Sequence, residues 1–288
     1  MYKVEEYTKN DDICFKYILS PNEKKSMSNI IHQVLNNYKS PTQTIPFVNS
    51  CISQIQTIYD NLNSFFIDNP GNYFLRLSSC SPKDAYYQLY CETSEIADDD
   101  EIVTVDDIKR DIAVLKVSDA QQTILVLCHS ERIYYDLEFD ETEIAIILMP
   151  WKDNILHDTE TRCFIKNKKL IAFSQYYTDL PTGYTSFLHE IDFPKKYYNC
   201  IVQFINRLLT ENKIPYENSV VDICYSRDSS LNLQTDNLIF IEINPFNIGT
   251  DAALFDWNYL LNLDESLVTN PLFKFKIDNE IKEITYFD

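Results

Sequence analysis

The chain has 288 residues, of which 45% are apolar and 14% aromatic, and its formal net charge is −19 at pH 7. This length and composition suit one large two-lobed domain or two small ones, and they exclude a disordered chain. Its 44 acids outnumber its 25 Lys and Arg residues, so we expect neither nucleic acid nor an anionic membrane as a partner. A basic protein surface is the easier partner, although the charge could equally serve only to keep the protein soluble.

The sequence carries no sign of export, membrane insertion or disulfide bonding. No apolar run approaches the ~20 residues needed to span a bilayer. The start, MYKVEEYTKNDD, lacks the apolar core of a signal peptide. The eight cysteines are scattered, without a pair at metal-ligand or redox spacing, and are expected to be reduced. These features predict a cytoplasmic protein, of its own cell or of a host cell.

The first third of the chain is predicted to be mostly helical. Residues 20–40 and 50–66 repeat apolar side chains at helical spacing, and the second helix should end before Pro70 and Gly71. NYFLRLSS (72–79) predicts a strand that enters a Ser-rich turn, with a helix near Ala85. ETSEIADDDE (92–101) predicts an acidic loop, and TVDDIKRDIAVLKV predicts a helix capped by Thr104.

The remaining elements are predicted to be mainly strands. TILVLCHS (123–130) and EIAIILMPW (143–151) are unbroken apolar runs, which are typical of buried strands. TRCFIK and KLIAFSQ predict a hairpin around the turn 166–169, and residues 196–209 predict an amphipathic helix. SVVDICYS (219–226) and NLIFIEINPF (237–246) predict two last strands. Helices mixed with antiparallel hairpins favour an α+β fold over a doubly wound sheet.

Several kinds of site are excluded by residue usage. Only three glycines occur, Gly71, Gly183 and Gly249, so the sequence contains neither a glycine-rich Walker loop nor a glycine-rich dinucleotide-binding motif. Any phosphate site must therefore use side chains. The four histidines have no spacing that pairs them with one another or with Cys, and no Ser-His-Asp or Cys-His arrangement can be assembled.

Polar residues interrupt the last two predicted strands. Side chains two apart share a face of a strand, so Phe240, Glu242 and Asn244 are expected to point one way. If the strand that carries Asp222 is the neighbour, the two acids and the amide can lie close together. Mg²⁺ takes oxygen ligands of this kind. The alternative is that they mark solvent-facing positions of an ordinary sheet, but the apolar neighbours and the strand-ending Pro245 favour a metal site.

Segments in the same order resemble the cell division cycle protein 123 family, an ATP-grasp-related group. FIEINPFNIGTDAALFDW (240–257) is similar to its C-terminal signature, and FLRLSSCSPKDA (74–85) to its strand and loop. LCHSERIYYDL (127–137) resembles its helix start, and TRCFIKNKKLIAFSQYY (161–177) its hairpin. The family's aromatic-rich opening has no match in the first sixty residues, which therefore could serve another partner.

The resemblance implies an ATP-grasp-like two-lobed fold with antiparallel sheets and a nucleotide bound between the lobes. Residues 1–145 would form the N-terminal helical region and first lobe, and 146–288 the second lobe with the metal-binding strands. ATP and Mg²⁺ are the implied cofactors, and Asp222, Glu242 and Asn244 the implied metal ligands. Substitution of Asp222 or Glu242 by Ala is expected to abolish magnesium-dependent ATP binding and to leave the fold intact.

The resemblance also implies phosphate contacts near the N-terminal strand. Arg76 stands where the family has Lys, and would meet the phosphates. Ser78, Ser81 and Asp84 would form the nearby loop, with Asp84 holding it by hydrogen bonds. The alternatives are a surface Arg on a strand and simple turn chemistry.

Further contacts are implied beside the adenine. Leu148, Met149 and Trp151 correspond to the connection whose backbone reads the purine edge, and Met149 replaces an Arg of the family. Trp151 is either a stacking wall or a core residue. Arg162 would reach the phosphates from the hairpin, or would instead form a cross-strand ion pair.

Members of this family are known as assembly factors for translation initiation factor 2 and bind its gamma subunit. The resemblance therefore implies a monomeric, ATP-dependent assembly chaperone whose client is a protein, the gamma subunit being the first candidate. The second hypothesis is an ATP-grasp ligase, or an enzyme that transfers phosphate or nucleotide to a protein or small molecule. No catalytic residue is assigned, since the same metal ligands would serve all of these functions.

Overall fold

The computed structural model describes residues 13–37, 41–85, 89, 104–188, 192–226 and 233–285. The chain divides into two compact units. The N-terminal unit holds the described residues of Thr8–Glu101 and Asp106–Trp151, and the C-terminal unit those of Ile102–Val105 and Lys152–Asp288. This division falls after Trp151 and not after residue 145, because β4 (Ala145–Pro150) pairs within the N-terminal sheet.

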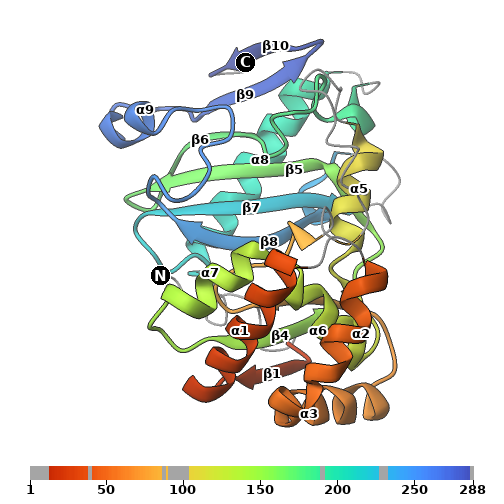
Figure 1. The fold of residues 1–288 in the computed structure, drawn as a ribbon. Coiled ribbons are helices and arrows are strands. Elements are labelled where there is room, and N and C mark those ends of the chain that lie inside the picture. The colour runs from red at the N-terminus through yellow and green to blue at the C-terminus, as the bar shows by residue number, and fades with distance from the viewer. Residues whose placement is uncertain are drawn as a thin grey trace. The chain divides into compact units, whose positions relative to one another are not determined.

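The N-terminal unit contains a four-stranded antiparallel sheet of order β1-β4-β2-β3. Its strands β1 and β4 are labelled in Figure 1. Besides β4, its strands are β1 (Phe15–Ile18), β2 (Tyr73–Leu77) and β3 (Lys116–Val117). Strand β4 lies between β1 and β2, so both of its edges are paired. A strand that is buried on both faces reads as a continuous apolar run, and β2 and β4 were predicted as strands.

Helices pack around this sheet and form most of the N-terminal core. They are α1 (Pro21–Asn37), α2 (Pro41–Cys51), the 3₁₀ turn η3 (Ile52–Ile55), α3 (Gln56–Asp68), α6 (Ala120–Cys128) and α7 (Glu131–Phe139). A further helix, α5 (Val105–Ala113), contributes none of its described residues to this core. Helices α1, α3 and α5 confirm predicted helices, although α5 ends before Lys116 and Val117, which pair as β3. Ala85 and Leu89 are helical as predicted, whereas the predicted acidic loop 92–101 lies outside the described residues.

Helix α6 occupies a segment that the sequence pattern predicted to be a strand. The side chain of Asp119 accepts a hydrogen bond from the backbone N of Gln122 and caps the helix. The helix packs against α1 and α3 and buries Thr123, Ile124, Val126, Leu127 and Cys128. A helix that is buried on most sides has no polar stripe, so its sequence resembles that of a buried strand.

The C-terminal unit is built on a six-stranded sheet of order β10-β9-β6-β5-β7-β8 (Figure 1). Its strands are β5 (Ile155–Lys166), β6 (Lys169–Gln175), β7 (Ser219–Ser226), β8 (Leu238–Pro245), β9 (Leu272–Ile277) and β10 (Glu280–Ile284). Only the β6–β9 pair is parallel within the described strands. The predicted β5–β6 hairpin is confirmed, with Asn167 and Lys168 at φ of 48° and 59° in its turn.

Different elements pack on the two faces of this sheet. Helix α8 (Phe193–Thr210), predicted from its amphipathic pattern, packs on the face that carries Phe173. The opposite face carries a smaller cluster in which Phe164 contacts Phe255, and this cluster includes residues of α9 (Trp257–Asn262). The short turns η4 (Thr185–Phe187) and η5 (Thr235–Asn237) complete the unit.

The architecture confirms the predicted α+β class with mainly antiparallel sheets. Across the described ranges, none of the helices has the length and apolar character needed to cross a bilayer.

Candidate functional site

Strands β7 and β8 bring Asp222, Glu242 and Asn244 together on one face of the C-terminal sheet. Asp222 lies opposite Glu242 in the antiparallel register, and Asn244 lies opposite Val220. The Nδ2 atom of Asn244 donates to Oδ2 of Asp222 at 2.9 Å and to Oε1 of Glu242 at 3.2 Å. The strand pairing that the predicted cluster requires is therefore present.

A β-bulge at this place changes the face of Phe240. Asp222 pairs with Glu242, but the next residue of β7, Ile223, pairs with Phe240, so Ile241 is the extra residue. Phe240 packs against the core cluster on the α8 side, which also contains Ile243. The prediction that Phe240 shares a face with Glu242 is wrong, because a bulge breaks the period-two alternation.

Arg162 on β5 lies directly opposite Asp222 on β7. Its Nε donates to Oδ1 of Asp222 at 2.9 Å and its Nη2 to Oδ2 at 2.8 Å. Its Nη1 donates to the carbonyl of Asp251 at 2.8 Å, and the guanidinium carbon lies 4.5 Å from the ring centre of Tyr176. The cross-strand ion pair, the alternative considered for Arg162, is therefore present.

This ion pair is removed from solvent. Asp222 is 0% exposed and Arg162 is 4% exposed, so the solvent-facing alternative is wrong for Asp222. Burial disfavours the charged guanidinium, but the attraction and hydrogen bonds of Asp222 outweigh this and raise the pKa of Arg162. Burial, and then the charge of Asp222, raise the pKa of the Cys163 thiol, which therefore stays neutral.

The donor chemistry of the cluster fits a hard cation. Two carboxylates and an amide are the oxygen donors that Mg²⁺ takes, together with water and phosphate oxygens. A carboxylate offers about four lone-pair sites, so the two hydrogen bonds from Arg162 and the one from Asn244 do not by themselves occupy every site of Asp222. Arg162 offsets one of the two acids, and a divalent ion would make the cluster net positive, which suits a polyphosphate. Among the residues that the structure describes, no group of three or more His, Cys, Asp or Glu is arranged to hold a metal, and this cluster has two acids and an amide.

Two of the other predicted residues lie along β2 in the N-terminal unit. Arg76 is 5% exposed and its Nε donates to the carbonyl of Leu77 at 3.0 Å, so it is not a surface strand residue. The backbone N of Ser78 donates to the carbonyl of Ala145 at 2.9 Å, and its hydroxyl accepts from the N of Ala145 at 3.0 Å. Ser78 thus extends the β2–β4 ladder by one step.

The loop that follows is tied to the start of α7. Asp84 accepts hydrogen bonds from the hydroxyl of Ser130 at 2.6 Å and from the backbone N of Arg132 at 3.1 Å. Ser130 in turn caps α7 by accepting from the N of Ile133 at 3.2 Å. Ser81 is buried in the same loop. Asp84 therefore holds the loop by hydrogen bonds, as expected, and a role of these residues toward a nucleotide stays a prediction.

The residues predicted beside an adenine lie on and after β4. Leu148 is fully buried and its carbonyl accepts from the N of Cys14 at 3.0 Å. Met149 lies opposite Phe74 in the sheet. Trp151 stacks on Phe74 with ring centres 6.4 Å apart and packs against the N-terminal core, which matches the core alternative. Contacts of these residues with a purine stay predictions.

The predicted residues thus lie in both units, and those of the C-terminal unit form one cluster. The acid–Arg cluster of the C-terminal unit consists of Arg162, Asp222, Glu242 and Asn244. Sequence reasoning missed Asp251 and Tyr176, which complete the surroundings of Arg162. Both lie in segments that carry the family resemblance. A contact to a backbone carbonyl cannot be predicted from the sequence, because every residue type has that carbonyl.

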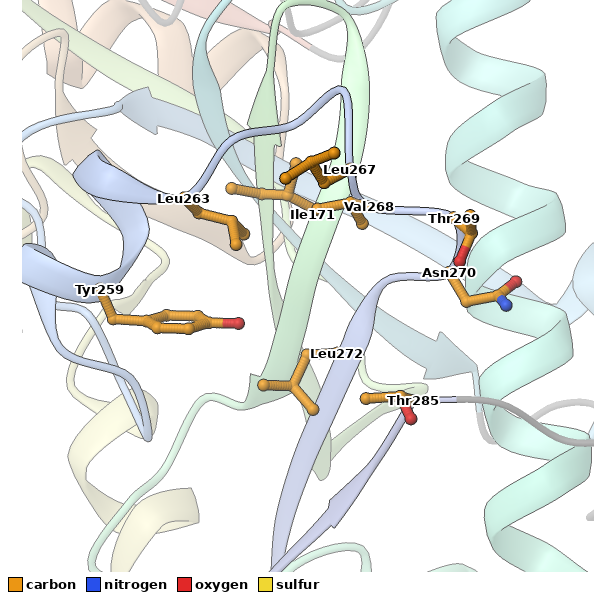
Figure 2. Close-up of a pocket in the computed structure, with 9 residues that line it drawn as sticks. All are labelled: Ile171, Tyr259, Leu263, Leu267, Val268, Thr269, Asn270, Leu272 and Thr285. Atoms are coloured by element: carbon orange, nitrogen blue, oxygen red, sulfur yellow. The ribbon is translucent and has the colours of Figure 1, made fainter.

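A cavity of about 310 Å³ lies elsewhere in the C-terminal unit. In Figure 2, the Tyr259 ring reaches into a space bounded by Leu263 on one side and Leu272 on the other. Its other lining residues are Ile171, Leu267, Val268, Thr269, Asn270 and Thr285. None of these side chains is charged, so the cavity suits an apolar group and not a polyphosphate.

Comparison with known proteins gives one family. The family model described as D123 matches residues 3–285. A Schizosaccharomyces pombe protein named translation initiation factor eIF2 assembly protein is 29% identical over 168 residues, which are 52% of this chain and 46% of the relative. A Yarrowia lipolytica protein named cell division cycle protein 123 is 23% identical over 274 residues, or 93% of this chain and 64% of the relative.

The relatives are longer than the matched segments. A Dictyostelium discoideum protein with the same assembly-protein name is 27% identical over 201 residues, which are 66% of this chain and 43% of that protein. The chain thus spans about half the length of the curated relatives it matches. The solved structure of Cdc123 from S. pombe has a similar fold, with a TM-score of 0.55, 20% identity, and coverage of 93% of this chain and 91% of that one.

Proposed function

Because the chain belongs to the D123 family, the family of cell division cycle protein 123, we propose that it is an assembly factor for translation initiation factor 2. The observation that carries this proposal is the match to relatives named for that role, together with the family match over residues 3–285, a range that includes the acid–Arg cluster. We take the gamma subunit as the client and a cytoplasmic monomer as the working form. The net charge of −19 favours a basic surface on that client.

The proposal includes a magnesium–ATP site in an ATP-grasp-like fold. Asp222, Glu242 and Asn244 would hold the ion, which, when bound, would offset the charge of the phosphates. Arg76, Ser78, Ser81, Asp84, Leu148, Met149, Trp151 and Arg162 remain the proposed nucleotide contacts. Support comes from the pairing of β7 and β8, which brings the carboxylates of Asp222 and Glu242 to the same side chain: Nδ2 of Asn244 donates a hydrogen bond to an oxygen of each.

Arg162 has a positioning role in this proposal. Its Nε and Nη2 atoms donate hydrogen bonds to the two carboxylate oxygens of Asp222. Its Nη1 atom donates to the backbone carbonyl of Asp251, in the segment that follows β8. The rigid guanidinium plane therefore joins the metal ligand to that segment, and a ligand that is already oriented loses less entropy on binding. The amide of Asn244 orients the same carboxylate from the other side.

Calorimetry on the purified chain tests the nucleotide part of the proposal. We expect ATP to bind with Mg²⁺ and to bind at least tenfold more weakly with EDTA, without ADP release. ADP formation that depends on an added carboxylate or amine would instead support the ligase hypothesis. Absence of magnesium-dependent binding would refute the site.

Complementation tests the assembly role separately. In cells depleted of their own assembly factor, expression of this chain is expected to restore the association of the gamma subunit with the other subunits, measured by affinity purification and quantitative mass spectrometry. Glu242→Gln is expected to restore less. Unchanged assembly on expression of a folded, ATP-binding chain would contradict the assembly role and leave the nucleotide site standing.

A further inference from the structure

Helix α7 presents a stacked pair of aromatic side chains to solvent. Tyr135 is 53% exposed and Phe139 is 69% exposed, and their ring centres lie 6.0 Å apart with an interplanar angle of 25°. They are four residues apart, so they share one helix face, while Ile133 and Leu137 are buried on the other. Single exposed apolar residues are ordinary, but two rings stacked in solvent form a contiguous apolar patch.

Acidic side chains surround this patch. The segment 131–143, ERIYYDLEFDETE, contains six acids and one Arg. Glu131, Glu138, Glu141 and Glu143 are exposed, and none of them forms an ion pair with any residue that the structure describes. One Arg cannot balance six acids, so the neighbouring acids repel one another in the free protein, and a basic partner would remove this repulsion.

Besides Arg132 within the segment, Lys24 of α1 approaches the chain here, but its ammonium group bonds to backbone carbonyls and not to these acids. Lys24 of α1 donates through Nζ to the backbone carbonyls of Asp140 and Thr142, at 2.6 and 3.2 Å. It therefore stabilises the chain after α7 by hydrogen bonds to the backbone. Glu138 accepts a hydrogen bond from the hydroxyl of Ser28, which is neutral.

We propose that this acidic–aromatic face is a docking surface for a basic, apolar protein segment. The face is defined by Glu131, Tyr135, Glu138, Phe139, Glu141 and Glu143. An apolar side chain of the partner would cover the stacked rings, and flanking Lys or Arg side chains would pair with the acids and lie over the ring faces. A second copy of this chain would bring like charges together, and a nucleic acid would bring phosphates toward the acids. The inference concerns the N-terminal unit and does not rest on the proposed function.

Synthetic peptides test the surface with the full chain. The probe is a fluorescent amphipathic peptide in which Leu and Phe alternate with Lys at helical spacing. One control peptide carries Glu in place of Lys, and another carries Ser in place of the apolar residues. We expect the basic amphipathic peptide to bind at physiological salt, and both control peptides to bind at least tenfold more weakly by fluorescence anisotropy.

Variants then assign the binding to this face. Tyr135→Ser with Phe139→Ser, and separately Glu141→Lys with Glu143→Lys, are each expected to weaken binding at least tenfold. The second pair keeps both rings and lies after the helix, so it tests the surface even if the first pair lowers stability. The matched control is Ile67→Ser, at a residue of α3 that is 70% exposed, and it should leave binding unchanged. Hydrogen exchange should show peptide-dependent protection within 131–143.

Three results would overturn the proposal. Equal binding to the wild type and to both surface variants would mean that only the overall negative charge attracts the peptide. Equal loss in Ile67→Ser would mean that the apolar contact lies elsewhere. A dimer in light scattering that Tyr135→Ser with Phe139→Ser dissociates would identify a second copy as the occupant.

Discussion

Arg162 and Asp222 face each other across strands β5 and β7, and two guanidinium nitrogens bond the two oxygens of the one carboxylate. Sequence reasoning treated Asp222 as one of two neighbouring acids and expected its removal to leave the fold intact. The structure gives it a buried cationic partner, so a substitution at Asp222 changes the stability of the sheet as well as any metal site.

Asp222→Ala is expected to lower the free energy of unfolding by about 3–5 kcal/mol, because it leaves the guanidinium of Arg162 buried without its counter-ion. Denaturant unfolding followed by circular dichroism measures this. Replacing both partners, Arg162→Met with Asp222→Leu, should recover most of the loss. A double variant no more stable than Asp222→Ala would contradict this account.

Glu242→Gln separates the metal site from the stability of the sheet. Glu242 is only half-buried and accepts from Asn244 through Oε1, a bond that the Gln carbonyl can replace. The free energy of unfolding should change by less than about 1 kcal/mol. Magnesium-dependent ATP affinity should fall about 10- to 100-fold by calorimetry. Unchanged affinity would remove Glu242 from the proposed ligands.

Gly183→Ala is expected to lower the free energy of unfolding by about 1–3 kcal/mol, because a Cβ at this position would lie 1.9 Å from Oε1 of Gln175. Gln175 cannot move freely, since it accepts from the N of Lys276 and donates to the carbonyl of Tyr177, both at 2.7 Å. Thermal unfolding measures the effect.

Gly71→Ala is the matched control for this prediction, because the nearest atom to a Cβ there lies at 3.6 Å, an ordinary contact. It should change stability by less than about 0.5 kcal/mol. Equal losses in the two variants would point to backbone flexibility and not to the contact with Gln175.

His129 is expected to make stability depend on pH. Burial lowers its pKa, and the hydrogen bond between Nδ1 and the carbonyl of Leu125 opposes this only in part. The unfolded chain keeps a histidine pKa of about 6.5, so at acid pH it binds more protons than the folded chain. The free energy of unfolding should therefore be unaffected by His129 above about pH 6.5 and should fall as the pH is lowered toward the folded pKa.

Melting temperatures from pH 5 to pH 7.5 test this dependence. His129→Gln keeps a donor for the carbonyl of Leu125 but cannot titrate, so its slope below pH 6.5 should be smaller. His32→Gln, at an exposed position of α1, is the matched control. An unchanged slope in His129→Gln would assign the acid sensitivity to other groups.

Much of the fold follows from local patterns in the sequence. Apolar spacing predicted α1, α3 and α8, and unbroken or alternating runs predicted β2, β4 and the β5–β6 hairpin. The helices bury one stripe, and the strands are buried on one or both faces, so consecutive residues carry the apolar pattern of each element. The family resemblance, which was read from motifs, is confirmed by the D123 match over residues 3–285.

Helix α6 and the bulge in β8 show where local patterns fail. TILVLCHS has no polar stripe because the surrounding helices cover α6 on most sides, and that cover belongs to the tertiary structure. The extra residue at Ile241 turns Phe240 toward the α8 side of the sheet. A prediction that assumes strict alternation of side chains places Phe240 on the other face. In both cases the deciding contacts come from segments that are distant in the chain.

The sequence by itself determined that Glu242 and Asn244 share one face of a strand and that Asp222 lies in another strand, because side-chain alternation is a local property of extended backbone. Only the tertiary structure decided what they contact. The partner of Asp222 is Arg162, 60 positions away, and the partner of Asp84 is Ser130, 46 positions away. The fold brings these residues together in space, although they are far apart along the chain. For Arg162 and Asp222, burial then makes each charge depend on the other, because removing one leaves an unpaired charge away from water.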